Sequence, residues 1–162
     1  MLSDRDRDRF LTALDRPVRP QPEAVRKTKA NRDITDNSVA KAYVAVSEES
    51  RVFGYYTIMA GEIGFKSIRG NLRCRLSRYP IPAVRISELA VDNSSQGMGL
   101  SRILLLNAFE RIANAAREVA VLAVVVDPID QQAANFYQHF GFESLLDTNT
   151  LFLTIRDLDY WL

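Results

Sequence analysis

Residues 86–112, ISELAVDNSSQGMGLSRILLLNAFERI, constrain the fold more than any other part of this sequence. They read as a strand, a turn with two glycines and a helix. Apolar side chains occupy Val84 and Ile86 and then Leu89 and Val91, so the period-two alternation slips by one residue near 87–88. Such a slip predicts a β-bulge, which bends the strand and frees backbone N–H or C=O groups for another partner.

Gly97 and Gly99 lie between the predicted strand and the predicted helix. Two glycines let backbone amides come close to a ligand, and a helix N-terminus adds unpaired N–H groups and the positive end of its dipole. This combination favours a bound phosphate group. The alternative is a strand–turn–helix in which the glycines serve only the turn.

The length of 162 residues predicts a sizeable core, and 47% hydrophobic with 25% charged residues is ordinary for a globular protein. No apolar run is long enough to span a bilayer, and the first ten residues are too charged for a signal peptide. Cys74 is the only cysteine and His139 the only histidine. We therefore expect no disulfide, no metal site, no membrane contact and a cytoplasmic location.

The segment between Glu62 and Glu88 contains no acidic residue. Its basic residues are Lys66, Arg69, Arg73, Arg75, Arg78 and Arg85. A local basic surface attracts phosphates whatever the net charge, so we expect Arg69, Arg73, Arg75 and Arg78 to bind nucleic acid. The alternative is a solvated loop with loose counterions. No recognition-helix motif is visible, which argues against sequence-specific DNA binding.

The remaining pattern predicts an α/β (α+β) fold over a mixed sheet. Two short helices are expected before residue 32, separated by prolines. Downstream we expect strands at 42–46 and 51–59 joined by a turn at 47–50, a basic connection at 62–83, a helix after the glycines, a buried strand at 119–126, a helix from Asp130 to Phe140 and a strand at 150–155.

The hexapeptide Ser94-Ser95-Gln96-Gly97-Met98-Gly99 resembles the pyrophosphate loop of the GNAT acyl-CoA N-acyltransferases, Gln/Arg-x-x-Gly-x-Gly/Ala. Ser94 departs from the usual Gln or Arg, which weakens the side-chain part of phosphate binding. The phrases LAVDNSSQGMGLSRILL and AANFYQHFGF are more similar to one branch, the toxins of type II toxin–antitoxin modules that acetylate aminoacyl-tRNA. The resemblance covers residues 29–155. It implies a mostly antiparallel sheet with a bulged central strand and flanking helices.

The resemblance also implies how acetyl-CoA is held as co-substrate. Backbone groups of Leu89 and Val91 would hold the pantetheine arm alongside the bulged strand. The pyrophosphate would accept hydrogen bonds from the N–H groups of Gly97, Gly99, Leu100 and Ser101.

Tyr137 is the candidate general acid. A phenol with a pKa of about 10 can protonate a thiolate whose thiol has a pKa of about 8.5 without first being ionised, and the resemblance places this tyrosine at the sulfur. The alternative for Tyr137 is core packing. Asn135 is a candidate hydrogen-bond partner of the cofactor arm. We interpret His139 as structural or exposed, and Glu88 as either structural or a general base acting through water.

Residues 1–28 resemble the C-terminal neutralising segment of the ribbon-helix-helix antitoxins that partner these toxins. The matching residues are Asp8, Arg9, Phe10, Leu11, Ala13, Leu14, Asp15, Pro17, Pro20 and Arg26. The chain therefore reads as an antitoxin-like arm, residues 1–28, followed by a GNAT-like domain, residues 29–162. The alternative is an unrelated helical arm. If the arm binds the domain, it acts as a tethered inhibitor.

Three functions are compatible with these patterns. The leading one is an N-acetyltransferase that uses acetyl-CoA and charged tRNA, works as a homodimer, and is restrained by an antitoxin or by its own arm. The first alternative keeps the enzyme but changes the acceptor to a small amine or a protein N-terminus. The second is a catalytically silent binding module, favoured by Ser94 and by the inhibitory-looking arm.

Overall fold

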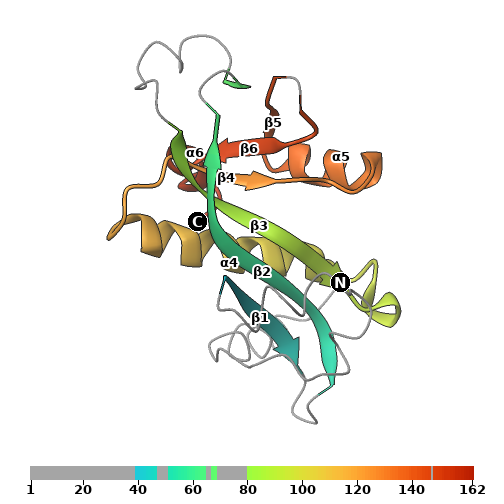
Figure 1. The fold of residues 1–162 in the computed structure, drawn as a ribbon. Coiled ribbons are helices and arrows are strands. Elements are labelled where there is room, and N and C mark those ends of the chain that lie inside the picture. The colour runs from blue at the N-terminus through green and yellow to red at the C-terminus, as the bar shows by residue number, and fades with distance from the viewer. Residues whose placement is uncertain (1–38, 47–50, 65–66, 69–79, 147) are drawn as a thin grey trace. The chain divides into compact units, whose positions relative to one another are not determined.

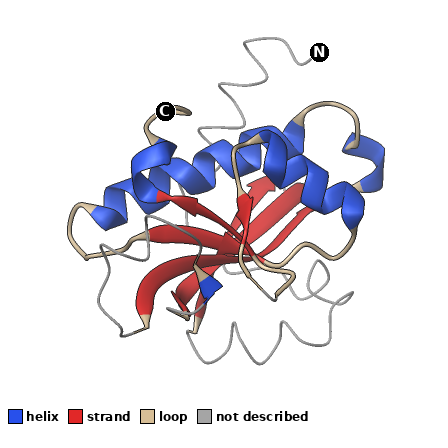
Figure 2. Ribbon diagram, turned by 90° about the horizontal axis from the view of Figure 1, so that it is seen from above, coloured by secondary structure: helices blue, strands red, loops and turns tan. Residues whose placement is uncertain are grey.

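The computed structural model describes residues 39–46, 51–64, 67–68, 80–146 and 148–162. In chain order the elements are β1 (Ala40–Val46), β2 (Val52–Ile63), β3 (Ile81–Val91), η3 (Asn93–Ser95), α4 (Leu100–Ala116), β4 (Ala123–Val126), α5 (Gln131–His139), β5 (Glu143–Ser144), β6 (Leu151–Thr154) and α6 (Ile155–Leu158) (Figure 1). The helix, strand and loop assignments can be followed in Figure 2. The predicted arm lies outside the described residues, as does the turn predicted at 47–50.

The strands form one six-stranded sheet in the order β1-β2-β3-β4-β6-β5. β1 and β2 are the predicted antiparallel hairpin, with Ala40 opposite Met59. β3 and β4 are parallel, with Ala83 opposite Ala123. β4 and β6 are antiparallel, and so are β6 and β5. The predicted mixed sheet is therefore confirmed.

The chain divides into two compact units. The first unit contains residues 87–109 together with the described residues up to Met59, and its interior is organised around Tyr56. The Tyr56 hydroxyl donates a buried hydrogen bond of 2.6 Å to Asn107 Oδ1 on α4. The Tyr43 ring stacks on Tyr56 with a centroid separation of 5.1 Å. These contacts fix β1, β2 and the first part of α4 to one another.

The second unit contains residues 60–86 and 110–162. Its apolar core includes Ile63, Ile68, Ile81, Ala83, Ala123, Val125, Leu145 and Phe152. All four residues of β4 are buried, as expected for a strand covered on both faces.

The buried strand starts later than the sequence predicted, at Ala123 rather than Val119. The N–H of Val119 still donates to the Ala115 carbonyl oxygen, at 3.0 Å, so the helical turns of α4 run on to this residue. The Val119 side chain is 63% exposed. Val119 therefore lies in the helical turn that follows α4 and is not part of the buried strand.

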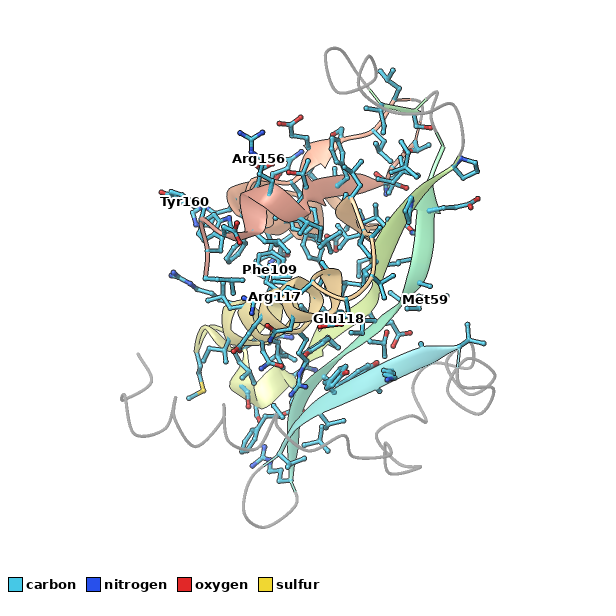
Figure 3. The ribbon with its side chains drawn as sticks, turned by 90° about the vertical axis from the view of Figure 1, so that its left-hand side faces the viewer. Met59, Phe109, Arg117, Glu118, Arg156 and Tyr160 are labelled. Atoms are coloured by element: carbon cyan, nitrogen blue, oxygen red, sulfur yellow. The ribbon has the colours of Figure 1, made fainter. Side chains whose placement is uncertain are left out.

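Other boundaries also differ from the prediction. β2 continues to Ile63 and β3 begins at Ile81, so both strands extend into the segment predicted as an irregular connection. β5 and α6 were not predicted because each is shorter than a pattern can reveal. Figure 3 shows Arg156 of α6 and Tyr160 just after it, with their side chains pointing away from the ribbon. No helix among the described residues is long and apolar enough to cross a membrane.

Candidate active site

The glycine turn joins β3 to α4 in the first unit. Asp92 caps η3 by accepting a hydrogen bond of 3.2 Å from the N–H of Ser94. Gly97 and Gly99 follow with φ angles of 76° and 80°. This left-handed region is disfavoured for residues with a Cβ atom, so the backbone path itself requires the two glycines.

The space in front of these glycines is open. A Cβ atom built at either position would meet no heavy atom of the described residues within 4 Å, apart from those of the immediate chain neighbours. The N–H groups of Arg102 and Ile103 both donate to the Gly99 carbonyl oxygen, at 3.1 and 3.3 Å. The N–H groups of Leu100 and Ser101 come before any that can bond within the helix. The turn thus presents backbone donors and the positive end of α4, an arrangement that binds anions.

α4 also starts without a negative charge, since no acidic residue occupies its first turn. Leu100 is buried and anchors this end of the helix. The sequence-predicted pyrophosphate residues Gly97, Gly99, Leu100 and Ser101 are therefore brought together on one turn. Their role as ligands of a phosphate stays a prediction.

A polar cluster that the sequence did not predict sits at the entrance to this turn. The Arg51 guanidinium donates from Nη2 to Ser94 Oγ at 2.7 Å and lies 3.6 Å from Asp92 Oδ2. The Ser94 hydroxyl in turn donates to the Asp92 carboxylate. This side-chain hydrogen bond, with help from Arg51, holds the pKa of Asp92 below its usual value. Asp92 is therefore ionised at neutral pH.

The end of β3 that leads into the glycine turn contains Leu89 and Val91, and both side chains are half-buried. The strand is held there by β2, because the Tyr55 hydroxyl donates to Glu88 Oε2 at 3.0 Å. This partly buried contact gives Glu88 a structural role. A Cβ atom at Gly54 of β2 would lie 2.7 Å from the Ala90 carbonyl oxygen.

The alternation of buried residues along β3 breaks earlier than predicted. Ala83 and Ile86 are both buried although they are three residues apart, and Val84 and Arg85 between them are half-buried. The sequence pattern predicts the slip near 87–88, because Val84 and Ile86 are both apolar and the next apolar pair is Leu89 and Val91. The strand continues to Val91 without a break. A bulge at 87–88 stays a prediction.

Tyr137 lies on α5 in the second unit. Asp130 caps this helix as predicted, accepting a hydrogen bond of 2.7 Å from the Ala133 N–H. The Tyr137 side chain is only 8% exposed and packs edge-on against the Phe136 and Phe142 rings, with centroids 5.3 and 5.4 Å away. Burial raises the pKa of Tyr137 to about 12. The phenol is therefore protonated throughout the physiological range.

Asn135 and His139 are exposed on the same helix. The Asn135 side-chain oxygen accepts a hydrogen bond of 2.8 Å from Gln131 Nε2, one turn earlier. A role for Asn135 in holding the cofactor stays a prediction. The His139 ring lies against Phe140 at 5.5 Å, which confirms the interpretation of this histidine as structural or exposed.

The predicted nucleic-acid contacts Arg69, Arg73, Arg75 and Arg78 lie outside the described residues. Arg85, from the same acid-free segment, forms an ion pair with Asp127 at the end of β4. Its charge is thus compensated within the second unit. Within the described ranges no group of three or more His, Cys, Asp or Glu side chains could hold a metal ion.

Comparison with known proteins extends these observations. The sequence matches the acetyltransferase (GNAT) domain family over residues 38–144. It is 36% identical to the tRNA-acetylating toxin of Mycobacterium tuberculosis over 110 residues, which cover 67% of this chain and 66% of that protein. The chain therefore spans just under two thirds of this relative's length.

Two of the solved structures with a similar fold are complexes of AtaT. AtaT complexed with acetyl-methionyl-tRNAfMet gives a TM-score of 0.75 with 24% identity, covering 91% of each chain. A tyrosine-to-phenylalanine mutant of AtaT bound to the C-terminus of the antitoxin AtaR gives a TM-score of 0.68 with 24% identity, covering 91% of this chain and 87% of that one. At these identities the likeness concerns the fold alone, and it confirms the predicted mixed, mostly antiparallel sheet with flanking helices.

Proposed function

The chain belongs to the GNAT acetyltransferase family, and we propose that it transfers the acetyl group of acetyl-CoA to the amino group of an aminoacyl-tRNA. The single observation that carries the proposal is the glycine turn, where Gly97 and Gly99 leave open space in front of helix N-terminal N–H groups. The acceptor is supported by the 36% identity with a tRNA-acetylating toxin and by the likeness to AtaT, which was solved with acetyl-methionyl-tRNAfMet.

The turn fits the pyrophosphate of acetyl-CoA. An anion needs several donors and room to approach them, and the positive φ of both glycines turns the backbone without placing a side chain in the way. We assign the N–H groups of Gly97, Gly99, Leu100 and Ser101 to the pyrophosphate. The main chain of Leu89 and Val91 is assigned to the pantetheine arm, because a strand end offers donors and acceptors along its length.

Tyr137 is assigned to the proton transfer. Acetyl transfer forms a bond between the amine nitrogen and the acyl carbon and breaks the bond between that carbon and sulfur. The departing thiolate takes the proton of the Tyr137 hydroxyl, and Tyr137 recovers a proton from the amine nitrogen. With its pKa raised to about 12 by burial, Tyr137 does not persist as a phenolate, so the two transfers are concerted.

Isothermal titration calorimetry with acetyl-CoA tests the enzyme proposal at its first step. Binding in the micromolar range supports it, and an absence of binding by folded protein favours the silent binding module. If acetyl-CoA binds, the acceptor is tested with charged tRNA, a small amine and a peptide N-terminus. If only the small amine or only the peptide is acetylated, that molecule is the acceptor and charged tRNA is not.

Variants of the basic segment between Glu62 and Glu88 give an independent test of tRNA as the acceptor. Changing Arg73, Arg75 and Arg78 to Glu should abolish tRNA binding and leave acetyl-CoA affinity unchanged, because phosphate contacts dominate nucleic-acid affinity. Activity on charged tRNA should also fall steeply with salt, whereas activity on a small amine should not. Unchanged tRNA binding by the triple variant would assign the basic segment to another partner.

Residues 1–28 are proposed as an antitoxin-like arm that restrains the GNAT domain, residues 29–162. The proposal rests on the resemblance of the arm to antitoxin C-terminal segments, and the complex of AtaT with the C-terminus of AtaR shows such a contact in a relative. Covalent attachment gives the arm a local concentration in the millimolar range, so a weak contact would be mostly occupied. We further propose that the protein is cytoplasmic and that it works as a homodimer.

A further inference from the structure

The glycine turn has an unfavourable charge at its entrance. Asp92 is ionised because hydrogen bonds from Ser94 and the nearby Arg51 stabilise its carboxylate. Acetyl-CoA carries several negative charges on its phosphates, and a like charge at the binding turn weakens their attraction. At position 94, where the pyrophosphate loop usually has Gln or Arg, this chain has a serine. A positive charge must therefore come from elsewhere if the phosphates are to be bound well.

Arg51 is positioned to supply that charge. Its Nη2 atom reaches Ser94 Oγ at 2.7 Å, so the guanidinium lies where a long side chain at position 94 would begin. Two further groups hold it there. The Asp92 carboxylate is 3.6 Å away, and the guanidinium stands over the Phe53 ring, 5.4 Å from its centroid. A guanidinium held by one group from β2 and two groups from the η3 turn is oriented before any ligand arrives.

We propose that Arg51 is a further cofactor-binding residue, whose guanidinium stabilises the phosphates of acetyl-CoA at the turn in place of an arginine at position 94. The assignment rests on the proposed function, because it assumes that the turn binds acetyl-CoA. Ser94 then has a new role as the acceptor that positions Arg51. The departure from the family pattern at position 94 is compensated by a residue 43 positions earlier in the chain.

Calorimetry with coenzyme A and with pantetheine, which lacks the phosphates, separates this role from a structural one. Arg51→Gln should raise the dissociation constant of coenzyme A about 10-fold, as expected for one charge-assisted contact. Pantetheine binding should not change. Lys41→Gln, which removes an exposed charge from β1 of the same unit, is the matched control and should bind both ligands like the intact chain.

A rescue variant completes the test. Adding Ser94→Arg to Arg51→Gln should restore most of the lost coenzyme A affinity, because it returns a guanidinium to the turn. Equal weakening of pantetheine, or no rescue, would show that Arg51 only supports the local fold. If Arg51→Gln bound coenzyme A normally while Gly99→Asp did not bind it, the Arg51 assignment would fall and the proposed function would stand. If the intact chain did not bind coenzyme A, the proposed function itself would fall.

Discussion

Gly54 on β2 lies so close to Ala90 on β3 that a Cβ atom at position 54 would stand 2.7 Å from the Ala90 carbonyl oxygen. The same atom would lie 2.9 Å from Leu104 Cδ1 on α4. The backbone of β3 therefore occupies the space of a missing side chain just before the glycine turn. Any residue larger than glycine must displace the strand end that we assign to the pantetheine arm.

Gly54→Ala should accordingly destabilise the protein by about 1–3 kcal/mol, because the methyl group overpacks against backbone that cannot move freely. It should also weaken acetyl-CoA binding. Gly61→Ala on the same strand is the control, since its Cβ atom would have no contact closer than 3.4 Å. Urea unfolding gives the free energies. Equal stability of the two variants would show that the strand end yields without cost.

Gly99→Asp should weaken acetyl-CoA binding by roughly 100-fold or more, because it places a carboxylate among the N–H groups assigned to the pyrophosphate. Gly99→Ala separates charge from strain. Its Cβ atom has open space, so only the positive φ opposes it, at about 1 kcal/mol, and its affinity loss should be much smaller. If Gly99→Asp and Gly99→Ala bind acetyl-CoA equally well in calorimetry, the turn is not the phosphate site.

Tyr137→Phe should keep the fold and the acetyl-CoA affinity and lower turnover by roughly two to four orders of magnitude, because the proton relay is lost. Tyr160→Phe is the control. Tyr160 is 84% exposed, and its side chain points outward in Figure 3. Single-turnover rates on charged tRNA compare the two variants. Full turnover by Tyr137→Phe would reduce Tyr137 to core packing.

The burial of Tyr137 also predicts how the free energy of unfolding changes at high pH. Its pKa is about 12 in the folded chain, and in the unfolded chain it is about 10. Below pH 10 both states are protonated, and above it the unfolded chain releases the proton first. Stability should therefore fall as the pH rises from 10 to 12, with Tyr137 contributing about 2–3 kcal/mol.

Urea unfolding between pH 9 and pH 11 measures the first half of this loss. Tyr137→Phe should lose less stability over the interval than the intact chain, whereas Tyr160→Phe should behave like the intact chain. Identical slopes for all three proteins would mean that Tyr137 is not buried in solution. The comparison does not depend on activity, so it tests the geometry of α5 alone.

The glycine turn and the caps could be predicted because their causes are local. Gly97 and Gly99 are needed by the backbone path, and Asp130 caps α5 through a residue three positions later. The contact between Arg51 and Ser94 could not be predicted in this way. It joins residues 43 positions apart and exists only once β2 and β3 are paired. The only signal in the sequence was Ser94. It indicated that a phosphate-binding side chain is missing from the loop, but it did not indicate that Arg51 takes the place of that side chain.

The boundaries of the buried strand show a second limit. Val119 and the residues of β4 form one apolar run in the sequence, and hydropathy alone cannot divide it. The division follows from the hydrogen bond of the Val119 N–H to Ala115, which extends the helix. The apolar run indicated a buried strand correctly, and the hydrogen bonds of the folded chain decided where that strand begins.

Acetyl transfer from acetyl-CoA to charged tRNA can be followed with labelled acetyl-CoA. The intact chain, a version starting at Glu23 and the Tyr137→Phe variant of that version are incubated with aminoacyl-tRNA, with folding checked by circular dichroism. N-acetyl amino acid released by mild alkali is then identified by mass spectrometry. We expect more product from the trimmed chain than from the intact chain, and very little from the Tyr137→Phe variant. If neither the intact nor the trimmed chain forms N-acetylaminoacyl-tRNA while both are folded and bind acetyl-CoA, charged tRNA is not the acceptor of this protein.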